Sequence, residues 1–132
     1  MPSYIEKAEQ INLPVIPLRG TVAFPAIAIN FEISDETDLA AARIAGSGSS
    51  LVFLTAYSEL SQKKKQVTDE FPFYTVGTVA KIKQLLRSPE GPTRIIAEGL
   101  ARATVIKYDF ADDHIEADLI CKNIFLPGHG GV

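Results

Sequence analysis

The residue types that carry metal and redox chemistry are scarce in this sequence. Its 132 residues include two histidines and one cysteine, fewer than an ordinary Cys/His zinc site requires. The single cysteine, Cys121, cannot form an internal disulfide, which fits a reducing compartment. The sequence therefore predicts neither a zinc site nor a disulfide framework.

Two polar segments have residue types that bind phosphate in other proteins. The glycine-rich run 46–50 would follow a helix rather than precede one, and no Gly-Lys-Ser/Thr comes after it. Phosphate-binding loops instead place the anion at the N-terminus of the next helix. The lysine run 63–65 is flanked by glutamines and followed by two acids. We interpret the first run as a plain turn and the second as a solvated loop, with phosphate binding or a localisation signal as the alternative for the lysines.

No set of side chains in the sequence indicates catalysis. We find no nucleophile with a base and an orienting group, and no Walker A motif. Ser49, Ser50 and Lys63 lie in the two polar segments, without the surroundings of a Ser-Lys dyad. We therefore predict no enzymatic activity for these residues and assign no catalytic, cofactor-binding or metal-binding residue.

Composition and charge are typical of one soluble globular domain. Hydrophobic residues make up 46% and charged residues 22%, with a net charge of -3. An acidic balance argues against a general nucleic-acid binder. The longest uncharged stretch, residues 20–31, is too short to cross a bilayer, and residues 1–10 lack the apolar region of a signal peptide. We expect a cytoplasmic protein.

Three strands are predicted in the first half of the chain. Pro14 and Pro17 exclude a helix in the run 13–18 and remove two ladder donors, so this strand is expected to be an edge or to be irregular. Alternating apolar residues predict a strand over 27–33. The continuous apolar run 51–56 predicts a strand buried on both faces.

One helix is predicted, from Glu36 to Ala45. Ser34 or Asp35 can accept hydrogen bonds from the first turn, and the acids there suit the positive end of the helix dipole. Gly46 is a suitable residue to end it.

The second half carries strand signals only. A half-buried strand is expected over 74–86, with Lys81 and Lys83 outward and these residues inward: Tyr74, Val76, Ala80, Ile82, Leu86. After a turn at 88–92, a strand at 93–98 is expected to break at Gly99. A hairpin turn at Asp112 and Asp113 then joins the strand 101–109 to a last strand. That strand has one inward face: Ile115, Ala117, Leu119, Cys121.

These elements predict a mainly β domain with one helix. About six strands in this length must close, or nearly close, into a barrel to hide their edges. The domain is expected to cover residues 11–122, after a polar lead-in over 1–10 and before a tail over 123–132.

Four short motifs, in this order, are similar to a known family. They are the run 13–19 (LPVIPLR), the pair Phe24-Pro25, the run 76–82 (VGTVAKI) and the run 98–103 (EGLARA). Together they resemble the N-terminal domain of the Lon protease family, over about residues 11–122. The resemblance implies a PUA-like pseudo-barrel that recognises substrates and helps to organise a hexamer.

The resemblance also implies that the chemistry lies elsewhere. In the family, an AAA+ module uses ATP and Mg²⁺, and a C-terminal domain carries a Ser-Lys dyad. Neither is present in this sequence, nor is the helical bundle that follows the barrel in the family. We expect either a domain cut out of a longer protein or a stand-alone homologue, and no cofactor in these residues.

Our leading hypothesis is a module that binds unfolded or damaged polypeptides, a task that needs exposed apolar surface. Burial in the core or anchoring of a loop is the alternative for each candidate residue. The candidates are Phe24, Pro25, Ile27, Phe71, Phe73 and Leu85.

The second hypothesis is an RNA-binding module, by analogy with PUA domains. The acidic charge counts against it, although five lysines and one arginine could form a basic patch: Lys63, Lys64, Lys65, Lys81, Lys83 and Arg87. We therefore expect protein substrates and other subunits of a hexameric parent as partners, and neither nucleic acid nor membrane.

Overall fold

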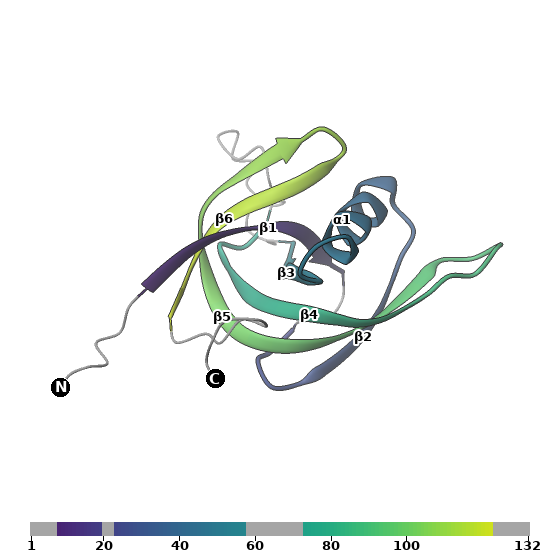
Figure 1. The fold of residues 1–132 in the computed structure, drawn as a ribbon, viewed down its shortest axis with the longest axis horizontal. Coiled ribbons are helices and arrows are strands. Elements are labelled where there is room, and N and C mark those ends of the chain that lie inside the picture. The colour runs from purple at the N-terminus through teal and green to yellow at the C-terminus, as the bar shows by residue number, and fades with distance from the viewer. Residues whose placement is uncertain (1–7, 20–22, 58–72, 123–132) are drawn as a thin grey trace.

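The computed structural model describes residues 8–19, 23–57 and 73–122 of the chain. The elements are β1 (Ala8–Leu18), β2 (Ala28–Ile33), α1 (Glu36–Gly46), β3 (Leu51–Ala56), β4 (Val76–Leu86), β5 (Thr93–Ala111) and β6 (His114–Lys122). The predicted mainly β class with one helix is confirmed (Figure 1).

The strands form one sheet that closes on itself. Their order is β2-β5-β4-β3-β1-β6, and β5 also pairs with β6. β5 can have these partners because it is 19 residues long: its first part pairs with β2 and its last part with β6. Five strands thus make a closed circuit, and β2 is the outer strand, paired only with β5 among the described strands. Closure removes most sheet edges, as the sequence predicts.

The sheet separates two hydrophobic cores. The alternation of β3 shows this directly, because Val52 and Leu54 enter one core while Leu51 and Phe53 enter the other. The first core is covered by α1 and β2, and the second is built from the five strands of the closed circuit together with Phe73. The prediction that β3 is buried on both faces is confirmed.

β1 is not an edge strand, so the first of the two alternatives expected for it, edge or irregular strand, is wrong. It lies between β3 and β6 in the sheet. β6 pairs with residues 8–14 of β1, and β3 pairs in parallel with residues 15–18. Pro14 is the last residue of the β6 pairing, so it falls where β1 exchanges one partner for the other. Pro17 lies within the short β3 ladder, opposite Thr55.

α1 begins where the sequence predicts and ends one residue later. Asp35 is the N-cap residue, but its side chain makes no capping hydrogen bond. Gly46 is the last helical residue, and Ser47 follows as the C-cap. α1 packs against β1, β3 and β6. It is neither long nor apolar enough to cross a membrane.

Two bulges change the expected faces of β4 and β5. β5 runs through Gly99 without a break, because a register shift between Val79 and Ala80 of β4 absorbs the irregularity. A second shift, between Ile82 and Gln84, inverts the alternation at the end of β4. β4 is also buried on both faces from residue 77 to residue 80, where it lies between the two cores. The expected half-buried strand is therefore wrong in this part.

Candidate functional site

A short turn over residues 23–27 is fastened to the sheet by three hydrogen bonds. The hydroxyl of Thr78 on β4 donates to the carbonyl of Ala23 at 2.9 Å. The N–H of Ala26 donates to the carbonyl of Gly99 on β5 at 2.9 Å, and the N–H of Gly99 donates to the carbonyl of Ile27 at 3.0 Å. Two neighbouring strands thus hold the turn in one position.

The turn presents apolar side chains to solvent. Phe24 is 50% exposed and Ile27 is 51% exposed, while Pro25 is half-buried. The guanidinium of Arg102 on β5 lies 5.9 Å from the centre of the Phe24 ring, a cation–π contact. Phe24 is therefore fixed at its backbone and supported at its ring, yet open on its outer side.

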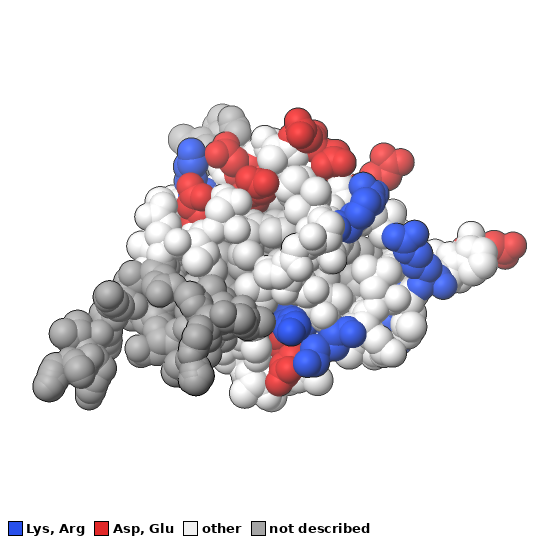
Figure 2. All heavy atoms as spheres, in the orientation of Figure 1, with Lys and Arg blue, Asp and Glu red and all other residues white. Residues whose placement is uncertain are grey.

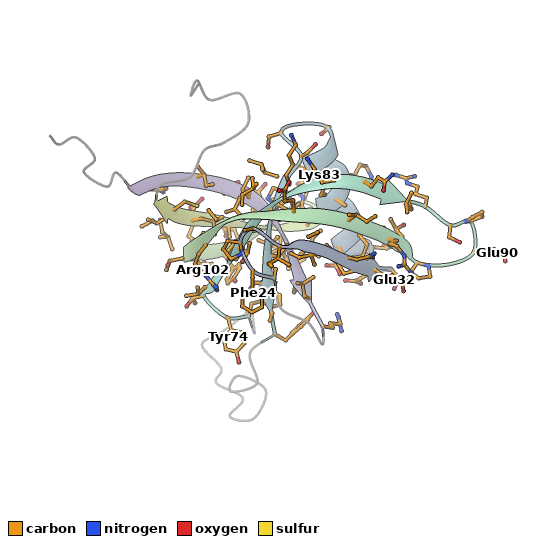
Figure 3. All side chains as sticks on the ribbon, turned by 90° about the horizontal axis from the view of Figure 1, so that it is seen from below. Phe24, Glu32, Tyr74, Lys83, Glu90 and Arg102 are labelled. Carbon is orange, nitrogen blue, oxygen red and sulfur yellow. The ribbon has the colours of Figure 1, made fainter. Side chains whose placement is uncertain are left out.

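Three further exposed apolar residues lie on the same face of the sheet. They are Tyr74, Val76 and Ile120. Val76 on β4 is paired with Thr104 on β5, and Thr104 is paired with Ile120 on β6, so Val76, Thr104 and Ile120 form one row across the strands. Arg102 is in the adjacent row. Figure 3 shows Phe24, Tyr74 and Arg102 projecting from one side of the molecule. We call Phe24, Tyr74, Val76 and Ile120, which are between 38% and 50% exposed, the apolar patch.

Two hydroxyl groups hold the backbone of Tyr74 in place. Tyr108 donates to the carbonyl of Tyr74 at 2.6 Å, and Thr55 donates to the same carbonyl at 3.1 Å. Burial raises the pKa of Tyr108 to about 12, so this hydroxyl stays protonated and remains a donor at neutral pH. The backbone is therefore fixed by hydrogen bonds at both ends of the apolar patch.

The structure separates the six candidates named from the sequence. Phe24 and Ile27 are exposed and Pro25 is half-buried, so these three are available to a partner. Phe71 lies outside the described residues. The role of any of them in binding a polypeptide stays a prediction.

Phe73 and Leu85 are packed inward, so their expected exposure is a mistake of the sequence analysis. Phe73 is 8% exposed and makes edge-to-face contacts with Tyr57 and Tyr108, at ring distances of 5.2 and 5.3 Å. An isolated bridge to Tyr57 draws it into the second core. Leu85 packs against the first core because the bulge before Gln84 turns it inward and leaves Leu86 exposed.

Sequence reasoning missed Tyr74, Val76, Arg102 and Ile120. The first two were assigned to the buried face of β4, but the cores cover only the middle of that long strand and leave its start exposed. Ile120 could have been found from the sequence. It is an apolar residue at an outward position of β6, and the two preceding outward residues, Glu116 and Asp118, are acids. Nothing in the sequence pairs Arg102 with Phe24.

Charge is distributed unevenly over the surface. In Figure 2, acidic side chains gather over the β5–β6 hairpin at the top of the view. His114 is buried in this hairpin, with its ring nitrogens 3.1 Å from the carboxylates of Asp113 and Glu116. The hydrogen bond with His114 lowers the pKa of Asp113. Arg102 borders the apolar patch through its contact with the Phe24 ring, and the chemistry of the patch itself suits apolar contact.

The fold and the exposed patch define a mainly β pseudo-barrel domain with a surface suited to binding. Residues 12–123 match the ATP-dependent protease La (LON) substrate-binding domain. The chain belongs to this family: it is a Lon N-terminal substrate-binding domain.

Curated relatives and solved structures agree with this assignment. The chain is 39% identical over 108 residues to a Lon protease of Clostridioides difficile, covering 80% of this chain and 13% of that protein. It is 34% identical over 112 residues to a Lon protease of Escherichia coli K12, covering 85% and 14%. The chain therefore spans about one eighth of the length of these relatives.

A Lon protease N-terminal domain from the Mycobacterium avium complex has the same fold, with a TM-score of 0.61 at 20% identity. The match covers 92% of this chain and 57% of the Mycobacterium avium complex chain. A Lon N-terminal domain protein from Xanthomonas campestris gives a TM-score of 0.59 at 18% identity, covering 90% and 62%. The predicted resemblance to the Lon family and the pseudo-barrel fold are confirmed.

Proposed function

We propose that this domain binds unfolded or damaged polypeptides through the apolar patch and presents them to the rest of an ATP-dependent Lon-type protease. The observation that carries the proposal is the patch itself. Its apolar side chains are exposed although hydrogen bonds fix the backbone at Tyr74 and directly before Phe24. Exposed apolar side chains are what an unfolded chain offers, and they are the natural partners of such a surface.

The remaining functions of the parent protein follow from the family. ATP hydrolysis with Mg²⁺ and peptide cleavage by a Ser-Lys dyad would be carried out by other domains of a longer, hexameric, cytoplasmic protein. In that division of labour the barrel supplies recognition and a contact surface for neighbouring subunits.

A polypeptide partner is favoured over RNA by the arrangement of charge. Lys83, one of the lysines that could bind a phosphate, lies 3.6 Å from the carboxylate of Glu98. The acids of the β5–β6 hairpin would repel a nucleic-acid backbone that crossed that face (Figure 2).

The test measures binding of a fluorescent, permanently unfolded casein to the purified domain. Phe24→Ala should weaken binding about tenfold, since truncating a well-supported aromatic contact costs about 1–2 kcal/mol or more. Phe110→Ala is the matched control, because Phe110 is 60% exposed but lies on the β5–β6 hairpin. If the two substitutions have equal effects, or if Phe24→Ala has none, the apolar patch is not the binding site.

A further inference from the structure

A cleft of about 920 Å³ lies where the end of β1, the strand β2 and the start of α1 meet. Its volume is in the range of small-molecule and side-chain binding sites, roughly 300–1,000 Å³. The charged residues that line it are Arg19, Glu32, Asp35, Asp38 and Arg94. None of them belongs to the apolar patch, so the cleft is a separate surface feature.

Asp38 is the unusual residue of this cleft. It lies in the first turn of α1 and is only 6% exposed. No hydrogen bond from a described residue reaches its carboxylate, and no side-chain oxygen that is completely buried among the described residues lacks a partner, so the carboxylate oxygens of Asp38 open toward the cleft that the residue lines. The nearby Arg19 does not serve as that partner, because its guanidinium donates to the Tyr57 hydroxyl at 2.9 Å and lies over the Tyr57 ring at 4.8 Å.

The neighbouring charges leave the cleft with a surplus of negative charge. Arg94 is already engaged, at 2.7 Å from the Glu32 carboxylate and 3.4 Å from the Asn30 side chain. Asp35 adds a second carboxylate next to Asp38, and its side chain does not cap α1. Burial first, and the charge of Asp35 second, raise the pKa of Asp38 to about 6. A cation entering the cleft would relieve both effects.

The cleft is also bounded by strand segments with open sides. β2, which contributes residues 30–33 to the lining, pairs only with β5 among the described strands. Residues 17–19, at the end of β1 and just after it, also line the cleft; Pro17 and Leu18 pair with β3 on one side, and the β6 pairing on the other side stops at Pro14. An extended main chain can hydrogen-bond along such an open strand and direct one of its side chains into the cleft.

We infer that the cleft binds the ammonium or guanidinium group of a basic side chain presented by an extended polypeptide, with Asp38 and Asp35 as the ion-pair partners. The inference rests on the proposed binding of polypeptides and adds a preference for lysine or arginine to it. An anionic ligand does not fit, because three carboxylates face the cleft and both of its arginines have partners.

The first experiment isolates the cation site. The probe is Nα-acetyl-arginine methylamide, and the uncharged Nα-acetyl-citrulline methylamide has nearly the same shape. Titrations followed by two-dimensional amide NMR should show millimolar binding of the arginine derivative, with shifts centred on residues 30–38, and at least about tenfold weaker binding of the citrulline derivative. Asp38→Asn should weaken the arginine derivative by a similar factor.

Asp109→Asn is the matched control, since it removes one carboxylate from the β5–β6 hairpin, where Asp109 pairs with Lys107 at 3.2 Å. It should leave binding unchanged. Equal binding of the two derivatives, no effect of Asp38→Asn, or no saturable binding of the arginine derivative would each overturn the inference.

The second experiment distinguishes this inference from the proposed function. Two unfolded peptides of identical apolar sequence, one with arginine and one with citrulline, are titrated against the domain. Asp38→Asn should weaken only the arginine peptide, whereas Phe24→Ala should weaken both. If both peptides bind equally and Asp38→Asn changes neither, the proposed function stands and the cleft inference fails. If neither peptide binds while the arginine derivative does, the cation site stands and the proposed function fails.

Discussion

The backbone of Phe24 lies directly against the α carbon of Gly99. A β carbon at Gly99 would overlap the carbonyl oxygen of Phe24 and come within 3.0 Å of its carbonyl carbon and 3.1 Å of the Pro25 α carbon. Glycine is needed here to make room for a crossing chain. The Phe24-Pro25 and Glu98-Gly99 motifs, far apart in the sequence, are therefore the two sides of one contact that fixes the exposed Phe24.

We expect Gly99→Ala to destabilise the domain and to displace the turn over residues 23–27. Forcing a methyl group against backbone atoms costs about 1–3 kcal/mol or more, since backbone gives way less readily than a side chain. Gly46→Ala is the matched control, because nothing lies within 4 Å of a β carbon at this helical position. It should stabilise by up to about 1 kcal/mol, through helix propensity. Urea unfolding of both variants decides this; a neutral Gly99→Ala would contradict the contact.

Truncation of Phe24 should cost much less stability than truncation of Phe73. Phe24→Ala removes a ring that is 50% exposed and should cost about 1 kcal/mol or less, mainly the contact with Arg102. Phe73→Ala removes a buried ring between two tyrosines and should cost about 3–5 kcal/mol. Thermal unfolding of both variants tests the assignment. A large loss of stability in Phe24→Ala would place Phe24 in the core and make it unsuitable as a binding residue.

The sequence predicts the fold well wherever one rule acts alone. The start of α1 at Glu36, the double burial of residues 51–56 and the hairpin turn at Asp112 all follow from local pattern. The interior position of β1 does not follow from local pattern. It depends on two distant strands, β6 and β3, each of which pairs with one half of β1. Sequence periodicity carries no information on that choice.

The site was predictable only in part for a related reason. Phe24 and Ile27 are apolar residues in a turn, where no periodicity requires burial, and they are exposed. The exposure of Leu85 was predicted wrongly because of a bulge, since one inserted residue exchanges the two faces of a strand. Asp38 gave no signal, because an acid in the first turn of a helix is ordinary; only the fold shows that this one is buried.

The buried carboxyl of Asp38 should make stability fall as pH rises. Its pKa in the folded protein is about 6, above the ordinary value of 3.8, so folding favours the protonated form. The stabilising contribution is therefore complete below about pH 4 and is lost as the pH passes through about 6. Asp35 opposes ionisation and Arg19 favours it, while Glu32 and Arg94 offset each other at 2.7 Å.

Asp38→Asn isolates this effect. The variant should unfold at nearly the wild-type urea concentration at pH 4 and be more stable than the wild type at pH 8, by at most about 3 kcal/mol for a shift of this size. Asp109→Asn, which changes an exposed carboxylate, should not alter the pH dependence. If wild type and Asp38→Asn lose stability in parallel between pH 4 and pH 8, Asp38 is not the group that titrates.

The isolated domain should be mostly monomeric, with weak self-association at high concentration. The prolines of β1 suggest that this strand protects a sheet edge. It does not, because β1 lies inside the sheet. The outer strand is β2, whose outward residues include Asn30 and Glu32, and Glu32 pairs with Arg94 of β5. Charged side chains on an outer strand discourage pairing between copies.

The apolar patch is the surface on which residual association should depend. A contact between two patches would bury less than the roughly 1,200 Å² typical of a stable interface, so its affinity should be low. Sedimentation equilibrium across micromolar concentrations should show a monomer with a slight rise in mass at the highest loading. Val76→Asp, which places a charge in the cross-strand row of the patch, should abolish that rise, whereas the same charge introduced by Phe110→Asp on the hairpin should not. A tight hexamer formed by this chain alone would contradict the prediction and would show that the barrel itself drives assembly.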